Sequence, residues 1–173
     1  MKTEADHSPF GLLTLPFLSF IRGILHMIIS VKIKIESIIE NLDSRGLIDG
    51  DPERSLTEAN GTYRYSDGEA FINFNEQGEY GKIHTEIKCL GGTVTVRRDG
   101  AIESNMHFAE GESHHSLYVI APYQFDSTVT AKRVRTDLTA EGGKIDLLYS
   151  MVLGGTEKNA RMKIWISQAS RQI

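Results

Sequence analysis

Apolar and polar residues alternate along most of the chain after residue 30. The segment VKIKIESII carries apolar side chains at every second position from Val31 to Ile35, with lysine and glutamate between them. Near the other end, RMKIWI repeats the pattern from Met162 to Ile166. Successive side chains of a strand point to opposite faces, whereas a helix would show a period near 3.6. The pattern therefore predicts strands with one buried and one exposed face, which is typical of antiparallel sheets.

The same alternation recurs in further short segments. Strands are expected within residues 31–39, 62–65, 70–75, 82–89, 93–98, 101–108, 116–120, 124–135, 143–153 and 161–166. Turn sequences lie between them at Ser66-Asp67-Gly68, Gly91-Gly92, Asp99-Gly100, Glu110-Gly111 and Glu141-Gly142-Gly143. Glycine tolerates the positive φ that tight hairpins need. About eight to ten strands at short, regular spacing indicate an all-β sandwich or up-and-down barrel. We predict a single closed antiparallel barrel over residues 31–173.

Residues 10–29 do not share this pattern. They are almost continuously apolar, which suggests a secretory signal or a membrane helix. Alanine is absent between Ala5 and Ala59, so a small-residue cleavage site is missing, and Arg22 interrupts the apolar run. We favour a third interpretation, in which translation starts near Met27. Residues 1–30 are then outside the barrel domain, and no membrane span is expected. If the segment is present, a helix across the barrel mouth is the alternative.

Composition narrows the class of partner. The 173 residues fit one domain, and 19 Lys+Arg against 23 Asp+Glu give a net charge of −4 without runs of one sign. Nucleic-acid binders usually carry a basic face and a high pI, so nucleic acid is not an expected partner. The single cysteine, Cys89, cannot form an internal disulfide. We expect it to be a small buried residue, and we expect a cytoplasmic protein.

The chain resembles the YwiB-like family of calycin-type, lipocalin-like β-barrels, a bacterial family of unknown function. The resemblance covers residues 31–168. The motifs that carry it are Gly61-Thr62-Tyr63, Val96-Arg97-Arg98-Asp99-Gly100, Phe108 with Gly111, Tyr118 with Ala121-Pro122-Tyr123, Thr136-Asp137-Leu138 with Gly142-Gly143-Lys144, and Tyr149 ahead of Gly154. The family pattern has other residues in place of Ala121 and Gln124. The resemblance implies the fold, but it supplies no catalytic residue.

The sequence holds no motif that predicts catalysis or a cofactor. Phosphate-binding loops, nucleophile elbows and HExxH zinc motifs are absent. His114 and His115 lie close to His107 and Glu112, but adjacent residues of a strand face opposite sides and cannot easily bind one metal ion. We therefore predict no catalytic residue, no metal site and no cofactor, and we favour a protein that is not an enzyme.

Three arginines and one tyrosine are the candidate binding residues. Arg98 has the same parity as Val94 and Val96, and Arg133 and Arg135 have the parity of the apolar positions earlier in their strand. A charged side chain inside a barrel needs a partner, and arginine can hold a carboxylate or phosphate with two parallel hydrogen bonds. Tyr149 shares the inward face of its own strand.

Two functional hypotheses follow from these residues. In the first, the barrel binds a small anionic or amphipathic molecule through Arg98, Arg133, Arg135 and Tyr149. A β-bulge that shifts the register would instead send the arginines to solvent. In the second, the barrel is filled by side chains and acts as an interaction or assembly module. A homo-oligomer is compatible with either.

Overall fold

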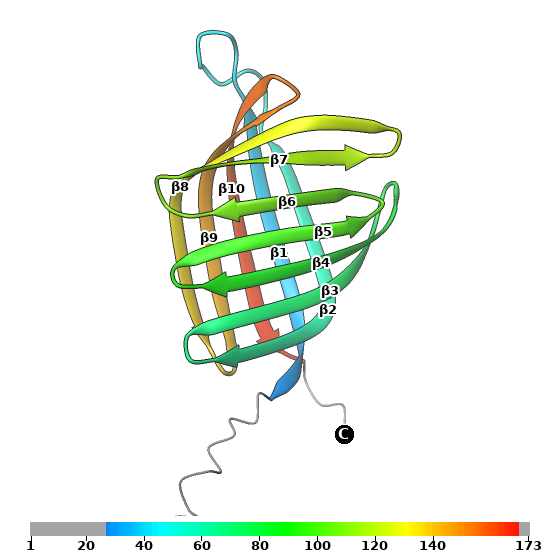
Figure 1. Ribbon diagram of the computed structural model, residues 1–173, viewed down its shortest axis with the longest axis vertical. Coiled ribbons are helices and arrows are strands. Elements are labelled where there is room, and N and C mark those ends of the chain that lie inside the picture. Colours follow the sequence, from blue (N-terminus) through cyan, green and yellow to red (C-terminus); the bar gives the residue numbers. More distant parts are fainter. Residues whose placement is uncertain (1–26, 170–173) are drawn as a thin grey trace, which may run out of the picture.

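Ten antiparallel strands make up the part of the chain that the structure describes, residues 27–169 of a computed structural model (Figure 1). The strands are β1 (Ile28–Asn41), β2 (Glu53–Ser66), β3 (Glu69–Gly78), β4 (Gly81–Leu90), β5 (Thr93–Gly100), β6 (Glu103–Phe108), β7 (Ser113–Ile120), β8 (Tyr123–Thr139), β9 (Gly142–Leu153) and β10 (Thr156–Gln168). No helix occurs within these residues. The all-β prediction is confirmed.

The strands close into one barrel with up-and-down connectivity. Each strand pairs with the next in the chain, and β10 returns to pair with β1, so that the sheet order is β1-β10-β9-β8-β7-β6-β5-β4-β3-β2. In the closing ladder, Ile33 lies opposite Ile166 and Ile35 lies opposite Ile164. The predicted closed antiparallel barrel is therefore confirmed.

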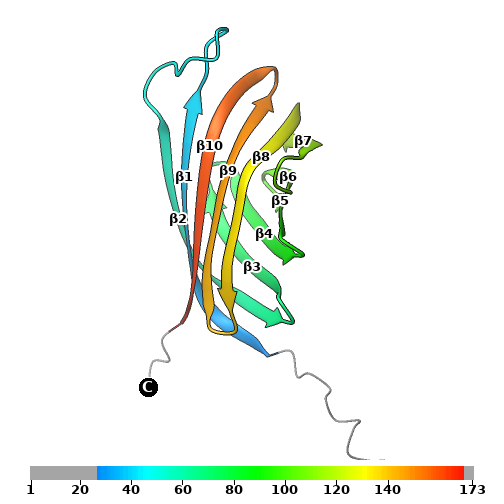
Figure 2. The ribbon, with the colours of Figure 1, turned by 90° about the vertical axis from the view of Figure 1, so that its left-hand side faces the viewer.

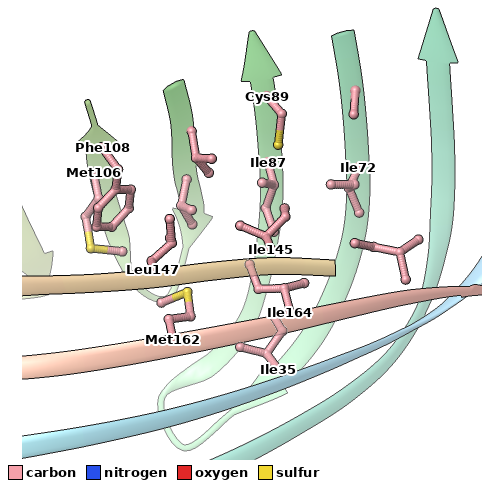
Figure 3. Packing of buried hydrophobic residues seen from close by; sticks show 14 of the residues in the cluster. Ile35, Ile72, Ile87, Cys89, Met106, Phe108, Ile145, Leu147, Met162 and Ile164 are labelled. Carbon is pink, nitrogen blue, oxygen red and sulfur yellow. The ribbon is translucent and has the colours of Figure 1, made fainter. Parts of the chain in front are cut away.

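Alternation explains which side chains fill the barrel. Buried residues occupy every second position along most strands, as Ile83, Thr85, Ile87 and Cys89 do along β4. Labelled aliphatic, aromatic and sulfur-containing side chains from strands on opposite walls meet in the interior (Figure 3). Burial of this apolar surface is the main source of stability in such a fold.

Tight turns join several strands. Asp67-Gly68 has φ values of 52° and 83°, and Gly91-Gly92 has 58° and 81°. Two successive positive φ angles match the two-residue hairpin turns whose twist suits the flanking strands. The long connection between the first two strands covers residues 42–52, because β1 continues to Asn41 and β2 begins at Glu53.

A β-bulge at Lys132 divides β8 into two halves with opposite parity. Ala131 lies opposite Tyr149, but Arg133 lies opposite Leu148, so one residue of β8 has no counterpart on β9. Before the bulge, Val129 and Ala131 are buried inside the barrel. A bulge of this kind exchanges the faces of every residue that follows it.

The barrel wall has two places where neighbouring strands separate. The β2–β3 ladder covers only residues 61–66 of β2, although β1 pairs with β2 as far as Glu53. Between β6 and β7, the described register comprises Glu103 opposite Val119 and Ser104 opposite Tyr118. In Figure 2, β1, β2 and β10 form a tall wall, and the shorter strands β5, β6 and β7 lie across the barrel from it. These openings interrupt an otherwise continuous sheet.

The expectations about the N-terminal segment largely concern residues 1–26, which lie outside the described residues. Strand β1 begins at Ile28, so residues 28–30, which we had assigned to the N-terminal segment, belong to the barrel wall. Within residues 27–169, no helix is long and apolar enough to cross a membrane.

Candidate functional site

The middle of the barrel is filled by side chains. Tyr63, Phe108, Ile145 and Leu147 are each at most 1% exposed and belong to one continuous buried cluster. The ring of Phe108 meets that of Tyr149 edge to face at 4.9 Å between centroids. A small pocket of about 120 Å³ lies at the end of the barrel beside Tyr65 and Cys89, and it is too small for a typical drug-sized ligand. Any larger ligand must therefore bind towards an opening.

Arg98 lies on the inner face of β5, near the opening between β6 and β7. It sits between Thr85 of β4 and Ser104 of β6 in the register, and both neighbours are buried. Ser104 in turn lies opposite Tyr118 of β7. Three adjacent strands thus place a guanidinium and several hydroxyl groups on one strip of the inner wall. Arg98, Ser104 and Tyr118 are called the inner polar strip below.

Two polar atoms of this strip have no partner. The Nε atom of Arg98 and the Oγ atom of Ser104 are buried and make no hydrogen bond within residues 27–169. No carboxylate in this part of the chain forms an ion pair with Arg98. Glu76 faces the same region, but its Oε1 accepts a hydrogen bond from Thr85 at 3.4 Å. Buried polar groups in proteins are nearly always satisfied, so these two atoms have hydrogen-bonding capacity that the described residues leave unused.

The positive charge of Arg98 affects the pKa values of two neighbouring tyrosines, Tyr118 and Tyr149. Burial raises the pKa of Tyr149 to about 12, and the positive charge of Arg98 partly opposes that rise. Burial likewise raises the pKa of Tyr118, again opposed by Arg98. Both phenols therefore stay protonated at neutral pH and can donate hydrogen bonds. The arrangement combines one fixed positive charge with neutral hydroxyl groups.

A lateral pocket of about 400 Å³ is lined by residues of β5 to β8, and Arg98 and Ser104 are among them. It lies where β6 and β7 separate, and its walls include Asn105 and Leu117 from these two strands. Asp99 and Glu103 also line it. The carboxylate of Asp99 is held by Arg97, whose Nε lies 3.1 Å from Oδ2.

Of the two orientations that the sequence leaves open for Arg133 and Arg135, the structure shows the outward one, which follows a β-bulge. Both follow the bulge at Lys132, so they lie opposite outward-facing residues of β9. Arg133 Nη2 lies 3.8 Å from Oδ1 of Asp146 on the outer face, and Arg135 is exposed. Asp146 is held more closely by Arg161, with an Nη2–Oδ2 distance of 2.8 Å. Of the four candidate residues, the structure brings together only Arg98 and Tyr149.

The other residues considered from the sequence form no comparable site. Cys89 is buried, and burial raises the pKa of its thiol to about 12. Nδ1 of His107 is hydrogen bonded to Thr95 and Nδ1 of His115 to Thr128, at 2.9 and 2.8 Å. Residues 27–169 contain no group of three or more His, Cys, Asp or Glu side chains that could hold a metal ion.

Trp165 lies on the outer face, as its parity predicts. The ammonium groups of Lys34 and Lys144 lie 5.3 and 5.7 Å from its ring. It borders a groove of about 480 Å³ over β2, β1 and β10. Lys34 is also paired with Glu36 at 2.9 Å, so its charge is partly neutralised.

Sequence reasoning missed Ser104 and Tyr118. Ser104 shares the phase of Met106, so its parity places it on the inward face, whereas Tyr118 shares the phase of the polar His114 and Ser116 and alternation does not assign it an inward face. No sequence signal showed that these two residues would be register partners beside Arg98. That relationship depends on the hairpin register, which only the assembled sheet reveals.

These features define a ten-stranded closed barrel with a filled centre and a lateral polar pocket. Residues 33–166 match the model of a family described as a domain of unknown function, DUF1934, and the chain belongs to this family. The chain is 26% identical over 129 residues to the uncharacterized β-barrel protein YwiB of Bacillus subtilis (strain 168), covering 75% of this chain and 86% of that protein. The crystal structure of the Bacillus subtilis ywiB protein has the same fold, with a TM-score of 0.72 at 24% identity, over 83% of this chain and 94% of that one. The family resemblance inferred from the sequence is confirmed.

Proposed function

We propose that this protein binds a small molecule carrying an anionic oxygen group, a carboxylate or a phosphate, in the lateral pocket between β6 and β7. The anionic group contacts Arg98 and Ser104. The proposal rests on one observation above all. Arg98 Nε and Ser104 Oγ are adjacent across two strands, buried, and without a hydrogen-bond partner among residues 27–169.

The chemistry of the strip favours an anion over a neutral ligand. The Nε–H group of Arg98 is buried without an acceptor, and an oxyanion offers acceptors to this donor and to a neighbouring hydroxyl. Tyr118 adds a protonated phenol on the next strand. Asp99 and Glu103 at the pocket wall disfavour highly charged ligands, so a single anionic group attached to a less polar body fits best.

The location differs from that of a barrel whose ligand occupies a central cavity. The buried cluster fills the centre, so only the part of the ligand with the anionic group reaches the inner wall. The rest of the ligand remains in the pocket, beside Leu117 and Val119. The proposed activity is binding without chemical conversion, since the pocket combines a cation and hydroxyl groups with no activated nucleophile.

The test begins with native mass spectrometry of the full chain purified from its own host, which reports any bound molecule. In parallel, inorganic phosphate and butyrate, a single carboxylate on an apolar chain, are titrated into the full chain while the side-chain Nε–H signal of Arg98 is followed by NMR. One or both probes should shift this signal saturably. Replacing Arg98 by glutamine should weaken binding roughly tenfold to a hundredfold, because hydrogen bonds to charged groups contribute about 1.5–3 kcal/mol.

Arg135→Gln is the matched control, since it removes the same charge from an exposed position on the outer face. It should leave binding unchanged. Ser104→Ala should weaken binding without changing the net charge. The proposal fails if no bound molecule is found and neither probe shifts the Arg98 signal, or if Arg98→Gln and Arg135→Gln bind the probes equally.

A further inference from the structure

Among residues 27–169, no strand pairs with one edge of the amino-terminal half of β2. Residues 53–60 pair with β1 on one side, but on the other side the ladder with β3 starts only at Gly61. At Gly61, the last pair of this ladder, the two strands lie so close that a Cβ atom would be 2.3 Å from the Asn73 carbonyl oxygen. Beyond this contact the two strands diverge. We call residues 53–60 the free edge of β2.

Arg54, Leu56 and Glu58 are three of the outward side chains of the free edge, and Asn60 is the fourth. Leu56 is 58% exposed, so its side chain is available for contact with another molecule. Arg54 and Glu58 form no ion pair within residues 27–169. Lys34, which lies opposite Glu58 on β1, is instead bound to Glu36.

Arg54 and Glu58 are arranged symmetrically about Leu56. If two copies of the free edge pair antiparallel around a twofold axis at Leu56, each Arg54 lies opposite Glu58 of the second copy. The two Leu56 side chains then meet at the axis. On the other face of the sheet, Ser55 lies opposite Thr57 of the second copy. Opposite charges and hydroxyl pairs directly across an antiparallel ladder are both stabilising.

We propose that the free edge of β2 is a homodimer interface, in which two barrels join edge to edge through a twofold antiparallel ladder centred on Leu56. Charged residues on an edge strand commonly prevent pairing. Here the opposite charges are placed so that a second copy neutralises them, whereas an unrelated strand would leave them without partners. A twofold interface uses the same patch on both subunits, and the sequence Arg54-Ser55-Leu56-Thr57-Glu58 is self-complementary in this sense.

The proposed interface is independent of the anion pocket. The free edge lies in the β1–β2 part of the barrel, and the pocket lies between β6 and β7. An edge of eight residues gives a small interface, so the dimer should dissociate on dilution. Its ion pairs are exposed, so high salt should weaken it.

Charge reversal provides the decisive experiment. Sedimentation velocity of the full chain from micromolar to millimolar concentration should show a monomer–dimer equilibrium. R54E places two glutamates opposite each other at both ion pairs, and E58R does the same with two arginines. Each variant alone should dimerise at least roughly tenfold more weakly. An equimolar mixture of R54E and E58R should restore the dimer, because every pair across the twofold axis is again of opposite charge.

Leu56→Lys should also weaken the dimer, since two lysines would meet at the axis. Leu47→Lys is its matched control, because Leu47 is 56% exposed but lies in the connection outside the free edge. A fully monomeric wild-type chain over this concentration range overturns the proposal. So does a dimer that persists unchanged in R54E and E58R, or a mixture of the two variants that fails to associate better than either alone. Normal circular dichroism spectra of both variants would exclude misfolding as the cause of weaker association.

Discussion

The hydroxyl of Tyr63 donates a 2.7 Å hydrogen bond to the carbonyl oxygen of Thr139, which lies 76 residues further along the chain. The bond joins β2 to the end of β8 across the interior of the barrel. Burial raises the pKa of Tyr63 well above its usual range, so the phenol remains a donor under all ordinary conditions. This single contact connects two walls that are distant in the sheet order.

Tyr63→Phe should therefore destabilise the barrel by about 1 kcal/mol, because the Thr139 carbonyl loses a partner while the ring stays buried. Urea unfolding followed by circular dichroism measures the change. Tyr123→Phe is the control, since Tyr123 is 66% exposed and its hydroxyl makes no hydrogen bond in the described residues. Equal free energies of unfolding for the two variants would contradict a stabilising role for the Tyr63 bond.

Deleting Lys132 should destabilise the fold far more than replacing it by another residue. The bulge keeps Val134 and Leu138 packed on the core, and without the extra residue the second half of β8 would turn these side chains outward. The deletion should cost more than about 3 kcal/mol, since burying one aliphatic side chain contributes about 1.5–3 kcal/mol.

Lys132→Ala is the matched control for the deletion. It removes only an exposed side chain, whose Nζ atom donates to Asn159 at 2.7 Å, and keeps the residue count. We expect a change within about 0.5 kcal/mol. A deletion variant that unfolds at the same urea concentration as Lys132→Ala would show that the bulge does not set the register.

Cys89 should resist thiol reagents in the folded protein. It is 4% exposed, and burial raises its pKa to about 12, so the reactive thiolate is scarce at pH 8. Labelling with an aromatic disulfide reagent should be slow and should accelerate in denaturant. The double variant Cys89→Ala, Leu90→Cys moves the thiol to a neighbouring position that is 40% exposed and should react rapidly without denaturant. Fast labelling of wild-type Cys89 would indicate local opening of β4.

Asp146 should make stability depend on pH in the acidic range. Its hydrogen bond with Arg161 and the charges of Arg161 and Arg133 hold its pKa below the usual value. A lowered folded-state pKa gives stability that is present above the unfolded pKa and is lost as pH falls through the folded one. Asp146→Asn should thus be less stable than wild type by about 1 kcal/mol at pH 7, and the difference should shrink as the pH falls below about 4.

Asp137→Asn is the control for this pH profile. Asp137 is exposed on the outer face and forms no ion pair within residues 27–169. The free energy of unfolding of Asp137→Asn should differ little from that of wild type at neutral pH. The role assigned to Asp146 is wrong if the wild-type and Asp146→Asn stability profiles run parallel from pH 7 to strongly acidic pH.

The fold could be predicted from the sequence because alternation is a local property. Val31, Ile33 and Ile35 predict their own buried face without knowledge of any partner strand. The faces of Arg133 and Arg135 could not be predicted in this way, since parity was counted from Val129 across a bulge that leaves no mark in the pattern. Arg98 follows no bulge, and its inward placement agrees with its parity.

The lateral pocket and the free edge could not be predicted from the alternation of apolar and polar residues alone. The lateral pocket exists because β6 and β7 separate beyond Ser104 and Tyr118, and the free edge exists because β2 leaves β3 at Gly61. Both depend on how far each pair of strands stays together. That length is determined by the twist and closure of the whole sheet.

The up-and-down connectivity has a consequence for folding kinetics. Nine of the ten ladders join consecutive strands and need only short loop closures, whereas the β1–β10 ladder joins residues 31–41 to 158–168. Closing this last seam carries the largest entropic cost, so it should form late. Until then β1 and β10 are open edges that could recruit other chains, and their alternating Lys32, Lys34, Arg161 and Lys163 side chains would oppose such aggregation during synthesis.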